Sequence, residues 1–273
     1  MKKNKMLIKT AVAVAGITLT VSILFFTPLW GTAILLSLLS GFGCYELIAA
    51  TGAVRETPVC VFAVCVAAFL PWLWYFRMQS VFLPLTAMTF LSAVFLFYAM
   101  REKGGMTKTI AYVCLSAIVV PSFFSLLLPV IQEENGKRLA LIPFVAAWGA
   151  DTGAQLFGRL LGKHKLAPTI SPNKTVEGFG GGLLFGVLCM AVYSLVLFLI
   201  KAPVPTAPLL GFGFLGACAG TVGDLFFSYV KREHGIKDFS SLMPEHGGVM
   251  DRFDSVVFVI PLFYAYIRLS PLT

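Results

Sequence analysis

Apolar runs long enough to cross a lipid bilayer follow one another along nearly all of the 273 residues of the chain. A membrane-spanning helix needs about 20 mostly apolar residues, and isolated strands cannot satisfy their backbone in lipid. Only 12% of the residues are charged and 58% are hydrophobic, whereas soluble domains carry about 25% charged residues. We therefore predict nine transmembrane helices, at residues 10–26, 29–50, 59–76, 80–100, 110–131, 139–161, 179–200, 208–230 and 253–269.

The distribution of Lys and Arg predicts the orientation of these helices, because cytoplasmic loops are enriched in positive charge. With the N-terminus in the cytoplasm, nine spans leave 5 of the 21 Lys and Arg residues outside, namely Arg77, Lys137, Arg138, Lys201 and Arg268. The predicted fold is an all-α, polytopic transmembrane helix bundle with a cytoplasmic N-terminus. Both long polar loops, residues 162–178 and 231–252, then lie on the cytoplasmic side.

The two halves of the chain differ in where their charged residues lie. In residues 1–138, Glu46 is the one clear charge within the predicted spans, which indicates scaffold helices. In residues 139–273, Asp151 and Asp224 enter apolar spans, and carboxylates inside a membrane usually mark a site or a water-filled cavity. We therefore predict that the C-terminal half and its two long loops form the catalytic region.

The first polar motif combines an acidic residue in a span with a lysine-rich loop. Asp151 lies on a polar helix face, where the alternative to a functional site is a packing hydrogen bond or a pair with Arg159. In the loop that follows, Ser171, Asn173 and Lys174 offer donors for phosphate oxygens. The alternative is an ordinary positively charged loop that only contacts lipid headgroups.

The second polar motif contains acids, bases and glycines in one stretch. Asp224, Ser228 and Lys231 share one face of a predicted helix. Asp251 and Asp254 lie three residues apart at the start of the last span. Carboxylates together with water and substrate phosphates are the ligands that Mg²⁺ prefers. The motif therefore predicts a magnesium site.

Positive charges surround these acids in the sequence and contribute to the net charge of +8; they are Lys231, Arg232, Lys237, His246 and Arg252. Such cations can neutralise a triphosphate and its leaving pyrophosphate. The backbone N–H groups of Gly247 and Gly248 can add an anion-binding nest. The alternative is a solvated charge cluster at the membrane surface.

The reaction class follows from which motifs are absent from the sequence. There is no Walker-type loop, no Ser–His–acid set with suitable placement and no cysteine beside a base. Phosphoryl and nucleotidyl transfer need little covalent help from protein side chains, because they depend on positioning and on charge stabilisation by metal and cations. These residues therefore favour a phosphoryl or nucleotidyl transferase.

The second motif resembles the signature of the phosphatidate cytidylyltransferase (CDP-diacylglycerol synthase) family. It reads S-x-x-K-R-x-x-x-x-K-D-F from Ser228 and P-x-H-G-G-x-x-D-R-x-D from Pro244. The segments W-x-x-D-T-x-A from Trp148 and S-P-N-K-T-x-E-G from Ser171 resemble the family's other recurring elements. A composite pattern over roughly the last half of the chain is more specific than a short glycine motif.

The resemblance implies CTP and phosphatidate as substrates, and Mg²⁺ with a potassium ion beside it as cofactors. It also implies a multi-pass homodimer in the cell inner membrane, whose active site faces the cytoplasm and whose partners include membrane lipid but no nucleic acid. Its metal ligands would be Asp224 and Asp251, and Asp254 and Asp151 would each either bind the metal directly or orient a ligand. The residues that contact phosphate or organise catalysis would be Lys231, Arg232, Lys237, Asp238, His246 and Arg252. The substrate-binding residues would be Asp151, Ser171, Asn173, Lys174, Ser228, Gly247 and Gly248.

Two other functions would also suit these residues. A CTP-dependent polyprenol kinase would share the phosphate ligands but would release CDP instead of pyrophosphate. A transporter would need charges through the full depth of its path, whereas here they gather toward one face and the chain has no internal repeat. With the resemblance, we predict metal-assisted in-line attack of a phosphatidate oxygen on the α-phosphorus of CTP.

Overall fold

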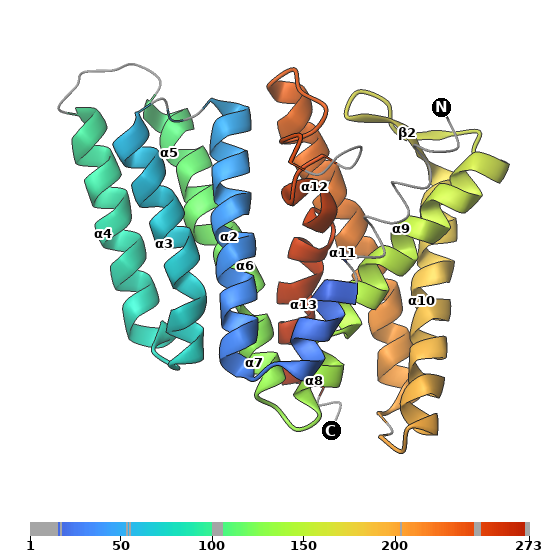
Figure 1. The fold of residues 1–273 in the computed structure, drawn as a ribbon. Helices are drawn as coiled ribbons and strands as arrows, with labels where there is room; N and C mark the ends of the chain where they lie inside the picture. The colour runs from blue at the N-terminus through green and yellow to red at the C-terminus, as the bar shows by residue number, and fades with distance from the viewer. Residues whose placement is uncertain are drawn as a thin grey trace. The chain divides into compact units, whose positions relative to one another are not determined.

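The computed structural model describes residues 16, 18–52, 54, 56–99, 106–202, 204–242 and 247–270, and these residues are mostly helical (Figure 1). The chain forms two compact units, unit 1 of Met1–Pro129 with Ile236–Arg252 and unit 2 of Val130–Gly235 with Phe253–Thr273. Residues 236–252, which the sequence analysis assigned to the catalytic half, thus group with the N-terminal helices.

Unit 1 is a bundle of apolar helices. Residues 18–26 are helical, and α2 (Leu29–Thr51), α3 (Thr57–Tyr75), α4 (Gln79–Ala99), α5 (Met106–Cys114), η1 (Leu115–Val119) and α6 (Val120–Ser125) follow. Neighbouring helices α2, α3 and α4 pack side by side (Figure 1). The small side chains of Ala63 and Ala67 on α3 face Cys44 and Ile48 of α2, and all four are buried. Close packing of small and branched residues therefore forms the core of this unit.

One predicted span of unit 1 contains a π-helical turn. At η1 the N–H of Val120 donates to the carbonyl of Leu115, five residues back. Pro121 follows directly and has no N–H to donate, and a wider turn is a common way for a helix to accommodate such an interruption. The helix nevertheless continues, and Lys108–Ile131 is long and apolar enough to span a membrane.

Unit 2 holds the remaining long helices and one hairpin. Its elements are α8 (Gly136–Leu139), α9 (Ile142–Leu161), β1 (Lys165–Ala167), β2 (Ser171–Thr175), α10 (Val176–Leu199), α11 (Thr206–Glu233) and α13 (Val256–Leu269). Two short helices, α7 (Leu127–Ile131) and α12 (Met250–Phe253), cross from one unit into the other along the chain.

Glycines let the helices of unit 2 approach closely. A Cβ atom at Gly182 of α10 would lie 3.0 Å from the carbonyl oxygen of Ala150 on α9, and one at Gly186 would lie 2.6 Å from the carbonyl oxygen of Gly213 on α11. Small residues at helix interfaces are typical of membrane bundles. Gly182 and Gly186 thus have a packing role here, whereas nothing lies within 4 Å of a Cβ atom at Gly180.

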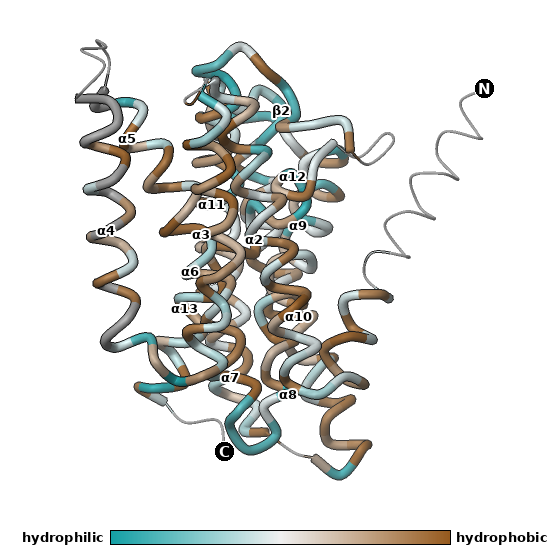
Figure 2. The backbone as a smooth tube through the Cα atoms, turned by 60° about the vertical axis from the view of Figure 1, so that its left-hand side comes forward, coloured by the Kyte–Doolittle hydropathy of each residue, from teal (hydrophilic) through white to brown (hydrophobic). Residues whose placement is uncertain are grey.

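The loop between α9 and α10 is a β-hairpin, which the sequence analysis did not predict. Strands β1 and β2 pair antiparallel, with Lys165 opposite Thr175 and Ala167 opposite Ser171. The hairpin is hydrophilic, in contrast to much of the helical bundle (Figure 2). A short strand pair of this kind is compatible with an all-α membrane fold because its polar backbone lies outside the apolar spans.

Among the described residues, five helices are long and apolar enough to cross a membrane: Leu29–Thr51, Thr57–Tyr75, Lys108–Ile131, Val176–Leu199 and Thr206–Glu233. A shorter apolar helix, Val256–Leu269, ends the described chain. Several apolar helices of this length indicate a membrane protein. The count of nine spans and the cytoplasmic N-terminus stay predictions, and part of the first predicted span lies outside the described residues.

Candidate active site

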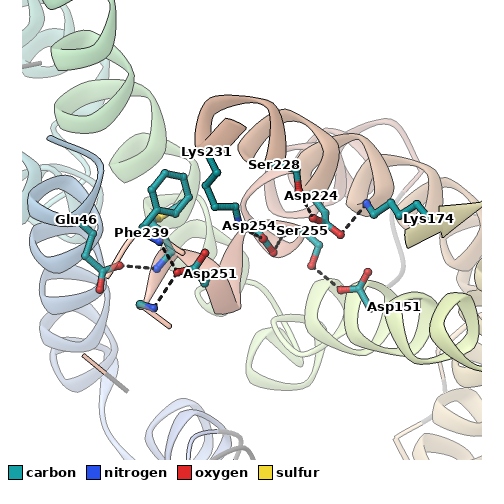
Figure 3. Close-up of polar contacts among 12 residues, drawn as sticks. Glu46, Asp151, Lys174, Asp224, Ser228, Lys231, Phe239, Asp251, Asp254 and Ser255 are labelled. Carbon is teal, nitrogen blue, oxygen red and sulfur yellow. Dashed lines mark hydrogen bonds and ion pairs between the residues drawn. The ribbon is translucent and has the colours of Figure 1, made fainter. Parts of the chain in front are cut away.

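A cluster of acids and lysines lies in unit 2, and we call its members Asp151, Lys174, Asp224, Lys231 and Asp254 the acid–lysine cluster (Figure 3). Helix α11 supplies Asp224 and Lys231, which the spacing in the sequence placed on one helix face. The other members come from α9, from β2 and from the segment just before α13. Four parts of the chain thus contribute charge to one cluster.

Asp224 is held by two partners. Its Oδ2 atom lies 2.7 Å from Nζ of Lys174 on β2, and both side chains are about a quarter exposed, at 27% and 23%. The hydroxyl of Ser228, one turn further along α11, donates to Oδ1 at 3.1 Å. The carboxylate therefore has one ion-pair partner and one neutral donor in a half-buried setting, where an ion pair is stronger than at an open surface.

Asp254 is more deeply buried than Asp224. Its Oδ2 atom lies 3.7 Å from Nζ of Lys231, and the two side chains are 13% and 10% exposed. The N–H of Ser255 donates to Oδ1 at 2.9 Å. Asp224 and Asp151 are close enough to repel the negative charge of Asp254, while Lys231 offsets it. A further cation near this group would be attracted by three carboxylates.

Asp151 connects α9 to the start of α13. Its Oδ2 atom accepts a hydrogen bond of 2.9 Å from the hydroxyl of Ser255. This is a packing hydrogen bond of the kind that the sequence analysis considered as the alternative to a functional role. Because Ser255 also donates its N–H to Asp254, the same contact places Asp151 near Asp254 in the acid–lysine cluster.

Small residues on α11 allow the cluster to form. A Cβ atom at Gly223 would lie 2.6 Å from the carbonyl oxygen of Asp254 and 3.0 Å from the side chain of Phe258. At Gly220 it would lie 3.6 Å from Ser255. A larger residue at position 223 would push the segment that carries Asp254 away from α11, and so from Asp224.

Lys174 is placed by the base of the hairpin. Glu177 accepts hydrogen bonds from the backbone N–H of Lys163 at 3.0 Å and of His164 at 3.2 Å, and Nδ1 of His164 lies 2.5 Å from the same carboxylate. The hydroxyl of Thr175 accepts the N–H of Gly178 at 3.1 Å and so caps α10. These bonds hold the residues just before β1 against the first turn of α10. Because α10 begins two residues after Lys174, they also fix the position of Lys174.

The other predicted residues of the hairpin differ in exposure. Ser171 is half-buried, whereas Asn173 is exposed. Both lie on β2 with Lys174. An exposed amide and a half-buried hydroxyl beside a lysine are suitable donors for a phosphate or a nucleotide.

In unit 1, Asp251 binds the backbone of its own segment. Its Oδ2 atom accepts the N–H of Phe239 at 2.8 Å and the N–H of Gly248 at 2.9 Å (Figure 3). Gly247 has φ of 77°, and a Cβ atom there would lie 2.8 Å from the same oxygen. The N–H of Gly248, predicted as part of an anion nest, thus donates to Asp251 in this structure.

A second carboxylate of unit 1, Glu46 on α2, was not among the predicted site residues. Its side chain is buried, at 2% exposure. It accepts hydrogen bonds from the N–H groups of Val249 and Met250, each at 2.9 Å, and from the hydroxyl of Ser240 at 2.7 Å. The signal that could have found it was present in the sequence, since Glu46 is the one clear charge in the N-terminal spans.

The remaining predicted residues are placed as follows. Four are exposed, namely Arg232 at the end of α11 and Lys237, Asp238 and Arg252 of unit 1. His246 lies outside the described residues. The structure thus brings together Asp151, Lys174, Asp224, Ser228, Lys231 and Asp254 in unit 2, and Gly247, Gly248 and Asp251 in unit 1.

The oxygen donors of the acid–lysine cluster suit a hard cation. Within the part of the chain that the structure describes, no group of three or more His, Cys, Asp or Glu side chains is arranged to hold a metal ion. Mg²⁺ is usually bound by one or two carboxylates, with water and substrate phosphates completing its ligands. Asp224 and Asp254, both in unit 2, provide such a pair without a soft ligand.

Comparison with known proteins agrees with this chemistry. The sequence matches the cytidylyltransferase family over residues 7–270. The chain is 39% identical over 181 residues to a phosphatidate cytidylyltransferase of Staphylococcus saprophyticus, covering 66% of this chain and 68% of the relative. It is 37% identical over 193 residues to a protein of the same name from Staphylococcus aureus, covering 70% of each. The match extends across both units, so the chain belongs to the cytidylyltransferase family and is a nucleotidyltransferase.

Proposed function

We propose that this enzyme transfers CMP from CTP to phosphatidate and produces CDP-diacylglycerol and pyrophosphate. The names of its relatives support these substrates. The observation that carries the proposal most directly is the contact of Lys174 with Asp224, because it joins the two sequence motifs that resemble the phosphatidate cytidylyltransferase family. A membrane enzyme of this kind takes one substrate from water and the other from lipid.

The proposed reaction is an in-line displacement at the α-phosphorus of CTP. An oxygen of the phosphatidate phosphate forms the new P–O bond, and the bond from the α-phosphorus to the bridging oxygen of the β-phosphate breaks. The electron pair leaves with pyrophosphate. A phosphomonoester has a second pKa of about 6, so it is largely a dianion at neutral pH and needs no strong general base. The protein must therefore position the substrates and neutralise charge.

Lys174 and Lys231 are the proposed groups for charge neutralisation. Each is paired with a carboxylate of the cluster, Lys174 with Asp224 and Lys231 with Asp254. When substrate phosphates bind, each ammonium group can donate one of its hydrogen bonds to a phosphate oxygen. A lysine that is already paired is oriented before the substrate arrives, which reduces the cost of organising the site.

Asp224 and Asp254 are the proposed protein ligands for Mg²⁺, which when bound would neutralise charge on the triphosphate. Asp251 stays a predicted ligand as well, although its Oδ2 atom already accepts two backbone N–H groups. A potassium ion, a homodimer and a cytoplasmic active site are further parts of the proposal. Size measurement of the purified protein with its detergent or lipid subtracted tests the dimer.

Product analysis tests the proposed reaction. Purified protein in detergent should release pyrophosphate only when CTP, phosphatidate and Mg²⁺ are all present, and CDP-diacylglycerol should appear in equal amount. A CTP-dependent lipid kinase would instead release CDP when given a lipid alcohol. Folded protein that releases no pyrophosphate from CTP and phosphatidate would refute the proposal.

A further inference from the structure

We propose that Glu46, in the apolar N-terminal half of the chain, is a positioning residue for nucleotidyl transfer. We infer that it holds residues 239–242 and 247–250, which we call the signature segment because they lie within the motif that resembles the family. The inference rests on the proposed function, since it concerns the efficiency of the same reaction. Glu46 acts through the backbone of the signature segment and does not itself contact substrate in this proposal.

The first observation is the number of donors that converge on one buried carboxylate. Oε1 of Glu46 accepts the N–H of Val249 at 2.9 Å and the hydroxyl of Ser240 at 2.7 Å, and Oε2 accepts the N–H of Met250 at 2.9 Å. A buried ionised carboxylate is costly unless it is fully hydrogen-bonded. Here three donors from the signature segment bind the carboxylate of Glu46. The segment thus stabilises the buried carboxylate, and the carboxylate in turn holds the segment.

The second observation is that the signature segment has little regular structure of its own. Residues 234–242 and 247–249 form turns, bends and an isolated bridge, so helix or sheet bonds do not satisfy most of their N–H groups. Glu46 accepts the N–H of Val249 and that of Met250, the first residue of α12, and Asp251 accepts those of Phe239 and Gly248. Backbone groups in irregular segments need such partners, and charged acceptors give the stronger hydrogen bonds.

The third observation is how closely the segment approaches α2. A Cβ atom at Gly248 would lie 2.5 Å from both carboxylate oxygens of Glu46. One at Gly43, nearly one turn before Glu46 on α2, would lie 3.0 Å from the sulfur of Met250. Glycine at both positions therefore permits the hydrogen bonds of Glu46 to form.

The position of the contact predicts its effect on the reaction. Lys237, Asp238 and Arg252 flank the signature segment and are predicted to contact phosphate or organise catalysis. Glu46 fixes the C-terminal end of the segment directly before Asp251 and Arg252. If these bonds are lost, the segment samples more conformations. Ordering it into the conformation that the reaction needs then costs conformational entropy.

The test compares three variants of the full-length protein in detergent. Glu46→Gln keeps the size of the side chain but turns one acceptor oxygen into an amide donor that faces an N–H group. Ser240→Ala removes one of the three donors and leaves the carboxylate in place. Glu134→Gln makes the same chemical change as Glu46→Gln at an exposed position of unit 2 and serves as the matched control.

Two measurements separate positioning from general stability. Hydrogen–deuterium exchange should be faster in peptides that cover residues 247–252 of Glu46→Gln, while α3 and α10 exchange as in the wild type. Pyrophosphate release should show kcat/KM for CTP reduced by about 10-fold or more in Glu46→Gln, as expected for losing a hydrogen bond to a charged group. Ser240→Ala should show a smaller change of the same kind, and Glu134→Gln should show none.

Each outcome decides a separate point. Unchanged exchange in folded Glu46→Gln would refute the contact, and faster exchange with wild-type kinetics would refute the positioning role. If Glu46→Gln does not fold, Ser240→Ala decides, since wild-type exchange and kinetics in that variant would overturn the proposal. If the wild-type protein makes no CDP-diacylglycerol, the proposed function fails, while the exchange measurement still tests whether Glu46 holds the segment.

Discussion

The ammonium group of Lys174 lies 2.7 Å from the carboxylate of Asp224. Lys174 belongs to the β-hairpin before α10, and Asp224 belongs to the middle of α11, so the pair joins two motifs that are far apart in the sequence. In a pair of this exposure, the cost of removing both charges from water offsets much of their attraction, so the pair contributes little to stability. The pair matters for its geometry, because it brings Lys174, a proposed phosphate contact, to Asp224, a proposed ligand for Mg²⁺.

Replacing Lys174 should therefore affect activity much more than stability. Lys174→Met keeps most of the apolar length but removes the charge, and we expect kcat/KM for CTP to fall by roughly 10- to 100-fold, as for loss of a hydrogen bond to a charged group. Lys174→Arg keeps the charge and should retain more activity. Steady-state pyrophosphate release measures both. Wild-type kinetics in Lys174→Met would exclude a phosphate contact by this residue.

Asp224→Asn should nearly abolish turnover while the protein stays folded. The amide keeps a hydrogen-bond acceptor for Ser228 but loses the negative charge that pairs with Lys174 and that would hold Mg²⁺. Activity should be restored only slightly by a higher Mg²⁺ concentration. Thermal unfolding in detergent provides the control for folding. Near-normal activity in folded Asp224→Asn would remove this residue from the proposed metal site.

The sequence was sufficient to predict a bundle of apolar helices and the polar face of α11, but it did not predict the ion pairs of Lys174 with Asp224 and of Lys231 with Asp254. Long apolar runs predicted the helices because the membrane restricts the backbone to few solutions, and helical spacing placed Asp224, Ser228 and Lys231 on one face of α11. The hairpin was missed because its strands are short and polar, with no alternating apolar pattern.

The role of Glu46 was missed for a different reason. Its partners, Ser240, Val249 and Met250, are about 200 residues away along the chain, at separations of 194, 203 and 204 residues. Two of the three donate backbone N–H groups, which every residue except proline carries. Nothing in the identity of those residues marks them as partners, so only the folded chain could show the contact.

Gly223 provides a test of packing at the acid–lysine cluster. In Gly223→Ala the added methyl group would meet the carbonyl of Asp254 and the ring of Phe258, and overpacking of this kind costs about 1–3 kcal/mol. Activity should fall as well because Asp254 moves. Gly180→Ala is the matched control, since nothing lies within 4 Å of a Cβ atom there. Thermal unfolding should rank the control at or above the wild type.

Glu177 should determine how firmly the hairpin holds Lys174. In Glu177→Ala the backbone N–H groups of Lys163 and His164 lose the carboxylate that accepts them, so the start of β1 should open more often. Trypsin should then cleave after Lys163 and Lys165 faster than in the wild type, with little change in cleavage elsewhere. KM for CTP should rise, since Lys174 would spend less time beside Asp224.

Thr175→Ala removes the cap of α10 without touching these bonds, so it separates fraying of the helix from opening of the hairpin. If the two variants gave the same cleavage pattern, Glu177 would act only through α10. If trypsin cut Glu177→Ala no faster than the wild type, the hydrogen bonds of Glu177 would not be what holds the hairpin closed.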